Sequence, residues 1–364
     1  MMTTERQLAT IRRVDNLTPI EGADLIETAH FGGWAVVVKK NTFSVGDLAV
    51  YCEIDSFVPN SIAPFLTKEG RDCHEFNGVL GERIRTIKLR GQVSQGLAFP
   101  VQSVVATGNE LGILCDAVGQ ILKDEFDDNI LVKEGDDVTE ILGIQKWEKP
   151  MSPQMAAMAR GNFPSFIPKT DQTRVQNMRD LHKHYGQVFE VTEKLDGSSC
   201  TMFIDKDGEF HVCSRNIDLK YEPGNYFWAV AEKYDIEKKL RELVFPYALQ
   251  GELIGPNIQG NTLKLTEHQF TIFDIYDFGL GKYLTPADRQ EVIQHLGLKS
   301  VPVLSNHTLT ESDNSKTLVD RADGFSVYSE LSSKTLREGL VFKSMDGLTS
   351  FKAISNKWLL KNEA

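Results

Sequence analysis

The chain has 364 residues, 41% of them hydrophobic and 25% charged, which is typical of a globular protein with two domains or three small ones. Its formal net charge of −11 argues against a general polyanion-binding protein, because such proteins are usually basic. The same charge permits an enzyme that gathers carboxylates around a metal and keeps a local basic groove.

No apolar run approaches the roughly 18 residues that a membrane helix needs, and the first residues lack the apolar core of a secretory signal. The five cysteines are an odd number without a Cys-x-x-Cys pair, so they do not predict a zinc site. We therefore expect a monomer in a reducing compartment, the cytoplasm, with no membrane partner.

The first part of the chain is rich in short strands separated by Gly-containing turns. The strand-like runs cover 8–14, 25–29, 34–38, 48–54, 83–89 and 96–100. Many short strands with such turns are typical of a small barrel. We expect an OB-type β-barrel over residues 1–148.

One of these runs is basic. Arg83, Arg85, Lys88 and Arg90 place four cations in eight residues, and Arg83 and Arg85 share one face of the expected strand. A cationic strand on a barrel can hold a nucleic-acid backbone, so these four residues are candidate nucleic-acid contacts. A charged edge strand that resists aggregation is the alternative interpretation.

A stretch rich in Pro, Met and Ala, residues 149–162, predicts a linker. Beyond it, strands alternate with helices expected at 170–185, 226–242 and 286–296. The last of these has Thr285 as a possible N-cap and Pro286 in its first turn.

Lys194 begins the sequence Lys-Leu-Asp-Gly-Ser, after the strand-like run 188–192. A lysine at a rigid strand end, followed by a turn with glycine at position 197, suits attack on a phosphate that the backbone can approach closely. Lys-x-Asp-Gly also occurs by chance in hairpin turns, so the other motifs of the chain decide between the two.

Four later segments accompany this motif in order. They are Ser-Arg-Asn at 214–216, Gln-Gly-Glu-Leu at 250–253, Phe-Asp-Ile at 273–275, and Glu-Gly-Leu-Val-Phe-Lys at 338–343 followed by Ser-Phe-Lys-Ala at 350–353. This series resembles the covalent nucleotidyltransferases, which include polynucleotide ligases and messenger-RNA capping enzymes. In detail it is similar to ATP-dependent RNA ligases of the nick-sealing branch that carry an OB domain in front.

The resemblance implies an α+β fold: an N-terminal OB-type β-barrel, then a nucleotidyltransferase domain of antiparallel sheets with flanking helices over 163–364. It implies ATP and Mg²⁺ or Mn²⁺ as cofactors and RNA ends or a nicked duplex as the partner. Only twelve residues follow Lys352, which leaves no room for the C-terminal OB domain usual in DNA ligases and capping enzymes.

The catalytic residues that the resemblance implies are Lys194 as nucleophile, Glu338 as organiser of the metal, and Lys352 on the α-phosphate. Glu252 is implied as a ribose contact or second metal ligand, and Phe273 as the ring that stacks on adenine. We place Lys169 and Arg174 on the β- and γ-phosphates of ATP. The remaining cofactor contacts are expected from Glu193, Asp196, Gly197 and Arg215.

Purely structural roles are the alternative for these residues. Phe273 lies in an apolar strand and could be a core residue, and the charged residues could form surface ion pairs. Lys194 must be neutral to attack, and we expect Lys352 and a bound metal to lower its pKa.

One position departs from the pattern, because related ligases often have Lys-x-Lys where this chain has Ser350 and Lys352. Lys343 and Lys357 are candidates to compensate. The sequence thus predicts an RNA ligase that works through lysyl-AMP and RNA-adenylate. The alternatives are another covalent nucleotidyltransferase, such as a DNA ligase or guanylyltransferase, and an inactive nucleic-acid-binding relative.

Overall fold

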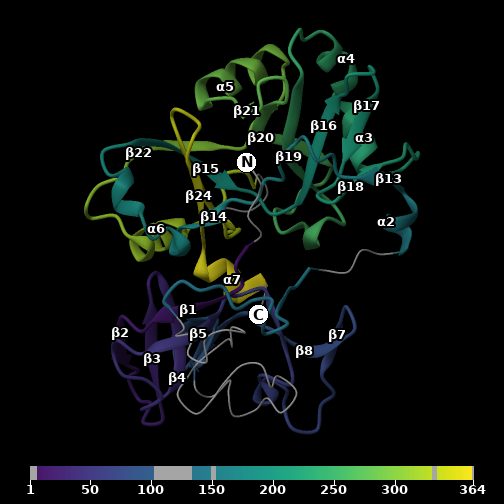
Figure 1. Ribbon diagram of the computed structural model, residues 1–364. Coiled ribbons are helices and arrows are strands. Elements are labelled where there is room, and N and C mark those ends of the chain that lie inside the picture. Colours follow the sequence, from purple (N-terminus) through teal and green to yellow (C-terminus); the bar gives the residue numbers. More distant parts are fainter. Residues whose placement is uncertain (1–5, 102–132, 149–152, 330–333, 363–364) are drawn as a thin grey trace, which may run out of the picture. The chain divides into compact units, whose positions relative to one another are not determined.

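The computed structural model describes residues 6–101, 133–148, 153–329 and 334–362 (Figure 1). The chain forms two compact units, which we call the N-terminal unit (Met1–Pro150 with Leu360–Ala364) and the C-terminal unit (Met151–Leu359). The first residues of the expected linker, 149–152, lie outside the described ranges. Within these ranges, no helix is long and apolar enough to cross a membrane.

The N-terminal unit consists of short strands around one apolar core, which includes Phe31, Trp34 and Tyr51. Its sheets have the orders β1-β5-β11, β2-β3-β4, β12-β6-β8-β7 and β10-β9. The strands are β1 Ala9–Arg13, β2 Asn16–Pro19, β3 Ile26–Phe31, β4 Trp34–Lys39, β5 Leu48–Cys52, β6 Ser56–Pro59, β7 His74–Phe76, β8 Val79–Arg83, β9 Thr86–Leu89, β10 Gln92–Gln95, β11 Leu97–Pro100 and β12 Gln145–Lys146, with a 3₁₀ helix η1 at Pro64–Leu66.

The expected strands 25–29 and 34–38 form a hairpin around Gly32. β3 and β4 pair antiparallel with Phe31 opposite Trp34, and Gly32 takes a positive φ of 60° in the two-residue turn. Along β4 every second residue, Trp34, Val36 and Val38, is buried. This alternation is the period-2 pattern that the sequence shows.

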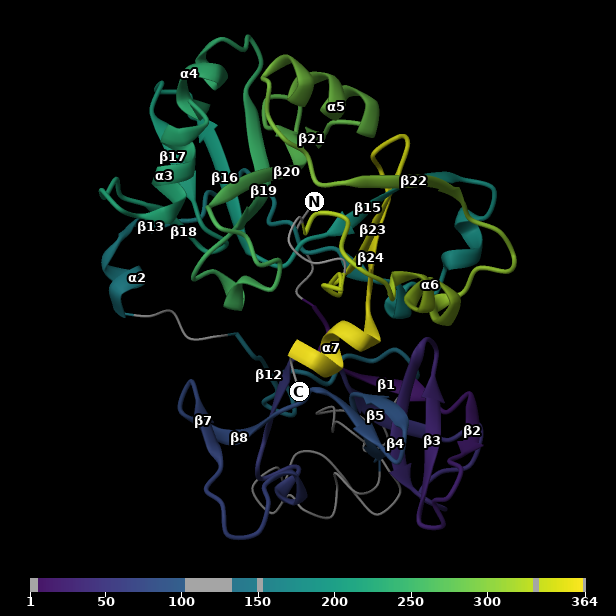
Figure 2. The ribbon, with the colours of Figure 1, turned by 180° about the vertical axis from the view of Figure 1, so that it is seen from behind.

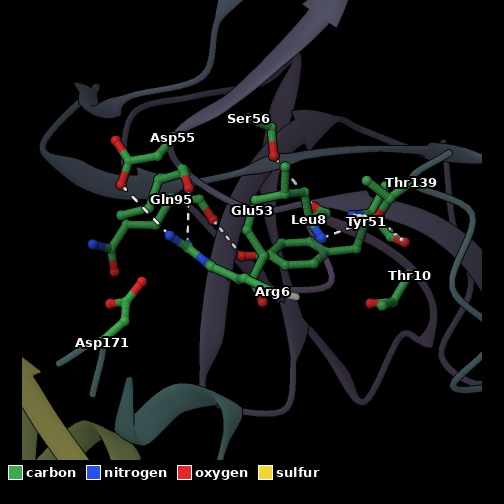
Figure 3. Close-up of polar contacts among 12 residues, drawn as sticks. Arg6, Leu8, Thr10, Tyr51, Glu53, Asp55, Ser56, Gln95, Thr139 and Asp171 are labelled. Carbon is green, nitrogen blue, oxygen red and sulfur yellow. Dashed lines mark hydrogen bonds and ion pairs between the residues drawn. The ribbon is translucent and has the colours of Figure 1, made fainter. Parts of the chain in front are cut away.

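A buried carboxylate organises the charged side chains of this unit. Glu53 follows β5, is 1% exposed, and accepts hydrogen bonds from Arg6 Nη2 at 2.8 Å and Arg12 Nη2 at 3.2 Å (Figure 3). Thr139 Oγ1 accepts from the Leu8 amide at 3.0 Å, which ties the N-terminal strand to residues far along the chain. A buried carboxylate needs positively charged partners, and Arg6 and Arg12 fill that role for Glu53.

The expected strand 83–89 is wrong as a single element. β8 ends at Arg83 in one sheet and β9 begins at Thr86 in another. The chain changes partners here because Ile84 is buried and its backbone pairs with Asp55 and Ser56 instead of continuing the ladder. Arg83 and Arg85 therefore do not lie on one strand face.

The C-terminal unit contains two sheets, with orders β13-β18-β17-β16-β19-β20-β21 and β14-β24-β23-β15-β22 (Figure 2). The seven strands of the first sheet are β13 Ala159–Asn162, β16 Ser198–Ile204, β17 Phe210–Cys213, β18 Ile217–Leu219, β19 Tyr247–Ile254, β20 Gln269–Asp277 and β21 Lys282–Tyr283. The five of the second are β14 Thr173–Arg174, β15 Val188–Lys194, β22 Val303–Thr308, β23 Gly339–Ser344 and β24 Ser350–Ile354. β13 falls inside the expected linker, and it pairs with β18 as the edge strand of its sheet.

Helices cover these sheets (Figures 1 and 2). The α-helices are α2 Pro153–Ala157, α3 Tyr226–Lys233, α4 Ile236–Arg241, α5 Pro286–His295, α6 Ser315–Ala322 and α7 Asn356–Asn362, and the 3₁₀ helices are η2 Val175–Asn177, η3 Leu181–His184 and η4 Gln259–Asn261. α3, α4 and α5 share one apolar core with β16, β17, β19 and β20. α6 packs in a second core with β15, β23 and β24.

The three expected helices have different outcomes. α5 is confirmed: Thr285 accepts a hydrogen bond from the Asp288 amide and Pro286 is in the first turn. The expected helix 226–242 is two helices, because Asp235 takes a left-handed φ of 52° between them. The expected helix 170–185 is wrong, since Thr173–Arg174 pairs in parallel with β24 and only 3₁₀ turns follow.

Two buried ion pairs lie between the sheets and α5. Arg289 of α5 binds Glu190 of β15, and Lys343 of β23 binds Asp274 of β20. All four side chains are buried, and burial lowers the pKa of Lys343 while Asp274 opposes that shift. Removing one partner would leave an uncompensated charge in the interior.

We predict that Asp274→Ala lowers the free energy of unfolding of the C-terminal unit by about 3–5 kcal/mol, because Lys343 loses its partner. The double variant Asp274→Ala with Lys343→Met should recover much of this loss. Urea denaturation followed by tryptophan fluorescence measures both. A double variant less stable than the single one would contradict the assignment of the cost to an unpaired charge.

Candidate active site

Lys194 is the last residue of β15, and the chain then crosses from one sheet to the other. Leu195, Asp196 and Gly197 connect β15 to β16, which begins at Ser198. In the second sheet Lys194 lies opposite Gly339, next to Glu338, and its Nζ lies 2.7 Å from the Glu338 carboxylate. Lys194 and Glu338, 144 residues apart in sequence, thus meet through the pairing of β15 with β23.

Steric contact with β19 explains why the Lys-x-Asp-Gly motif has glycine at position 197. A Cβ on Gly197 would lie 2.4 Å from the Leu253 carbonyl oxygen of β19, which no side chain tolerates. The bare backbone also donates its N–H to the Glu252 carboxylate. Gly197 therefore brings the crossing segment and β19 into direct contact beside Lys194.

Carboxylates outnumber lysines around this point. Burial lowers the pKa of Lys194, but Glu338, Glu252 and Asp196 raise it more strongly, so the net shift is upward. The positive charge of Lys352 alone does not outweigh these carboxylates, and the expected lowering of the pKa by Lys352 together with a bound metal stays a prediction. Burial raises the pKa of Glu252 to about 8, helped by Glu338 and Asp196 and opposed by Lys194.

This donor set fits a hard divalent cation. Glu338, Glu252 and Asp196 offer carboxylate oxygens, the ligands that Mg²⁺ and Mn²⁺ take. Burial and the nearby carboxylates both disfavour the charged form of Glu252, and a bound cation would favour it. Glu338 and Glu252 are the residues best placed to hold such an ion.

Phe273 lies at the border of an apolar cluster rather than inside the core. It is partly buried against Leu195, Ile254, Leu263, Leu265 and Val301, with Tyr328 beside it. Its neighbours Phe270 and Ile272 belong to the separate core under α3 and α5. A partly exposed ring on this cluster provides a flat apolar surface for a base.

Lys352 and Arg215 meet at Asp171. The Asp171 carboxylate accepts from Lys352 Nζ at 3.0 Å and from Arg215 Nη2 at 3.2 Å. Burial lowers the pKa of Lys352 to about 8; Arg174 and Lys194 act in the same direction and Asp171 opposes them. Arg174 is mostly buried on β14, directly beside Lys352 of β24.

Lys169 and Glu193, both predicted to contact the cofactor, form hydrogen bonds to other segments of the chain. Lys169 is exposed and donates to Asn216 Oδ1 at 2.9 Å. Glu193 is 1% exposed, accepts from the Val327 amide at 2.9 Å, and has its pKa raised by burial. Glu193 thus anchors the segment that leads toward Glu338.

Neither candidate lysine takes the place of the one missing at position 350. Ser350 bonds Gln172, and it lies opposite Lys343 in the β23–β24 hairpin. Lys343 is buried against Asp274, and Lys357 is exposed beside Asp323 at 3.4 Å. Lys352 is therefore the lysine of this hairpin that lies close to Lys194.

The four basic residues of the N-terminal unit differ in their surroundings. Arg83 binds Asp55 at 2.6 Å and stacks on Trp147 at 4.1 Å, so it is part of the internal network. Arg85, Lys88 and Arg90 are exposed around the β9–β10 hairpin, with Arg90 in its turn at a φ of 47°. These three remain candidate nucleic-acid contacts.

Sequence reasoning did not single out Asp171 or Gln250. The link of Asp171 to two cations depends on contacts 44 and 181 residues away in the sequence. Gln250 lies on β19, the strand that carries Glu252, and pairs with Thr201 of β16. Because Gln250 and Glu252 are two residues apart on one strand, their side chains lie on the same face of the sheet.

The two sheets, the crossing lysine and its ring of carboxylates define the nucleotidyltransferase fold of ligases. A family model described as RNA ligase matches residues 187–358, and one described as an OB-fold domain matches 8–101. A comparison with curated proteins found no match. Among solved structures, an apo mutant of Naegleria gruberi RNA ligase is 41% identical, covering 98% of each chain with a TM-score of 0.84.

Two further structures of the Naegleria gruberi ligase carry ligands. A mutant with ATP and Mn is 41% identical over 98% of this chain and 99% of that one, with a TM-score of 0.83. The same ligase with PPi is 42% identical over 98% and 99%, again with a TM-score of 0.83. The chain belongs to the RNA ligase family. The expected architecture of an OB-fold domain and a ligase nucleotidyltransferase domain is confirmed.

We predict that Glu338→Gln lowers the pKa of Lys194, because the carboxylate that stabilises its ammonium form is removed. Lys194 should then react with an amine-specific reagent at lower pH than in the wild type, as measured by peptide mass spectrometry over a pH series. Lys357, which is exposed beside Asp323, serves as the internal control. An unchanged pH midpoint at Lys194 would contradict the electrostatic account.

Proposed function

We propose that this chain is an ATP-dependent RNA ligase that joins a 3′-hydroxyl to a 5′-phosphate through lysyl-AMP and RNA-adenylate. The observation that carries the proposal is the position of Lys194 between Glu338 and Glu252, with Lys352 close by. A nucleophilic amine, carboxylates for a cation and a second lysine for a phosphate are the parts that in-line displacement at phosphorus needs.

In the first step the neutral amine of Lys194 attacks the α-phosphate of ATP. A phosphorus–nitrogen bond forms, the bond to the bridging oxygen breaks, and pyrophosphate leaves. The adenine packs on Phe273 and the ribose lies against Glu252. Lys352 and Arg215, which both bind Asp171, hold the phosphates by exchanging the Asp171 carboxylate for phosphate oxygens.

Glu338 and Glu252 would hold a divalent cation, which would supply positive charge to offset the carboxylates around Lys194 and the charge of the phosphates. The raised pKa of Lys194 comes from those same carboxylates, so neutralising them would favour its neutral amine. Lys169 and Arg174 are placed to orient the β- and γ-phosphates in line with the attack.

In the second step an oxygen of the RNA 5′-phosphate attacks the same phosphorus, and Lys194 leaves. In the third step the 3′-hydroxyl attacks the 5′-phosphate and AMP leaves. The partner is therefore RNA ends or a nicked duplex. Arg85, Lys88 and Arg90 supply a further backbone contact, and we expect a monomer in the cytoplasm, consistent with the free thiols of the four described cysteines.

Two other activities are tested by the same experiments. A guanylyltransferase would use GTP at the same lysine, and a DNA ligase would seal DNA nicks as readily as RNA. An inactive binding relative is disfavoured because Lys194, Glu252, Glu338 and Lys352 are all present and close together.

We predict that ATP labelled at the α-phosphate transfers its label to the protein in the presence of Mg²⁺ or Mn²⁺. Lys194→Ala should abolish the label, and Lys194→Arg should abolish it as well, because arginine does not deprotonate at usable pH. Lys357→Ala is the matched control and should be labelled like the wild type. Labelling of Lys194→Ala would remove the nucleophile assignment, and preferential labelling by GTP would favour the guanylyltransferase.

We predict that the double charge reversal Arg85→Glu with Lys88→Glu weakens RNA binding. It should also reduce the magnitude of the slope of log affinity against log salt concentration by about 1.5, since the loss of two phosphate contacts means that fewer counterions are released on binding. Lys39→Glu with Lys40→Glu is the control, because both lysines are exposed in the same unit and the charge change is equal. Equal slopes in the two double variants would exclude the hairpin as a binding surface.

A further inference from the structure

Asp171 lies between two cations that the proposed function assigns to phosphate. Its Oδ1 accepts from Lys352 Nζ at 3.0 Å, and its Oδ2 accepts from Arg215 Nη2 at 3.2 Å. One carboxylate thus joins a lysine of β24 to an arginine in the turn between β17 and β18, which belong to different sheets. A phosphate group offers a similar pair of negatively charged oxygens, so it can bind these cations in place of Asp171.

The backbone on both sides of Asp171 is fixed within the C-terminal unit. Before it, the Pro168 carbonyl accepts from Gln250 Nε2 at 3.0 Å. After it, β14 pairs in parallel with β24, the strand that carries Lys352. The carboxylate can turn away from the cations, but this backbone keeps it within reach of them. A tethered group has a high effective concentration, so Asp171 competes with any phosphate that binds the same cations.

The charges around Lys352 favour an anion beside it. The Lys352 side chain is 16% exposed, so solvent screens its contact with Asp171 less than it screens a surface ion pair. Burial lowers the pKa of Lys352 to about 8, Arg174 and Lys194 act in the same direction, and Asp171 opposes the shift. Asp171 thus already stabilises the charged lysine, and a phosphate gains there only what exceeds that contribution.

The nucleotides of the proposed reaction differ in how many phosphate contacts they can make against this competition. ATP carries two further phosphates, for which Lys169 and Arg174 are the proposed partners. AMP, which is released in the last step, carries a single phosphate that depends on Lys352 and Arg215. Competition by Asp171 therefore removes a larger share of the phosphate binding of AMP than of ATP.

We propose that Asp171 weakens the binding of the AMP product by competing with its phosphate for Lys352 and Arg215, and so promotes its release. The proposal rests on the proposed ligase function. Asp171 acts on the nucleotide only through the two cations, so removing its charge should strengthen AMP binding. A carboxylate that merely held the cations in position would have the opposite effect, because its loss would weaken AMP binding.

The test is isothermal titration of the full chain with AMP and with adenosine, which lacks the phosphate. The protein is first treated with pyrophosphate and Mg²⁺ to reverse any lysyl-AMP formation. Asp171→Asn should bind AMP roughly three- to tenfold more tightly than the wild type, as expected for competition from two partly exposed ion pairs, and adenosine equally. An AMP affinity that is unchanged or lower would overturn the proposal, as would an equal gain for adenosine.

Asp180→Asn is the matched control, because Asp180 pairs with Lys183 at 2.7 Å in the same unit and the change of net charge is equal. It should bind AMP like the wild type, and a gain equal to that of Asp171→Asn would overturn the proposal.

A second arm measures inhibition of nick sealing by added AMP. Asp171→Asn should be inhibited at a roughly three- to tenfold lower AMP concentration than the wild type, and equal inhibition of the two proteins would overturn the role in product release. Absence of both lysyl-AMP and sealing in the wild type would refute the ligase function itself, whereas the titrations would still decide whether Asp171 competes with phosphate.

Discussion

The site depends on the short passage of the chain from one sheet to the other. Three residues, Leu195 to Gly197, separate the end of β15 from the start of β16. So short a crossing works only where the backbone of Gly197 touches β19 without a side chain. Because of that contact, Lys194 from one sheet lies beside Glu252 from the other. The Lys-x-Asp-Gly spacing is therefore a packing requirement as well as a chemical one.

The same passage explains the electrostatics. The first sheet brings Glu252 to Lys194 and the second brings Glu338, while Asp196 comes from the segment between β15 and β16. These carboxylates raise the pKa of Lys194, and burial, helped by Glu338 and Asp196, raises the pKa of Glu252. The net charge of −11 is unevenly distributed, because the cations Lys352, Arg215 and Arg174 lie together near these carboxylates.

The features that could be predicted from the sequence are those that short local patterns determine. Lys194, Glu252 and Glu338 stand in short motifs, and Thr285 with Pro286 marked the start of α5 correctly. The failures come from distant contacts. Residues 170–185 are not a helix because β24, nearly 180 residues away, offers Thr173 and Arg174 a partner. Arg83 is not a free basic side chain because Asp55 and Trp147 hold it. No local pattern reports such partners.

The β23–β24 hairpin carries two lysines whose ion-pair partners and burial differ, and these differences set their structural roles. Lys343 and Lys352 lie on the two strands of one hairpin, opposite Ser350 and Val341. Lys343 is enclosed with Asp274 and helps to join the sheets, whereas Lys352 shares Asp171 with Arg215 and lies near Lys194. A lysine at position 350 would lie directly across from Lys343, and like charges opposite each other are destabilising. Ser350 avoids that repulsion and bonds Gln172 instead, so Lys352 is the lysine of this hairpin that we propose for contact with phosphate.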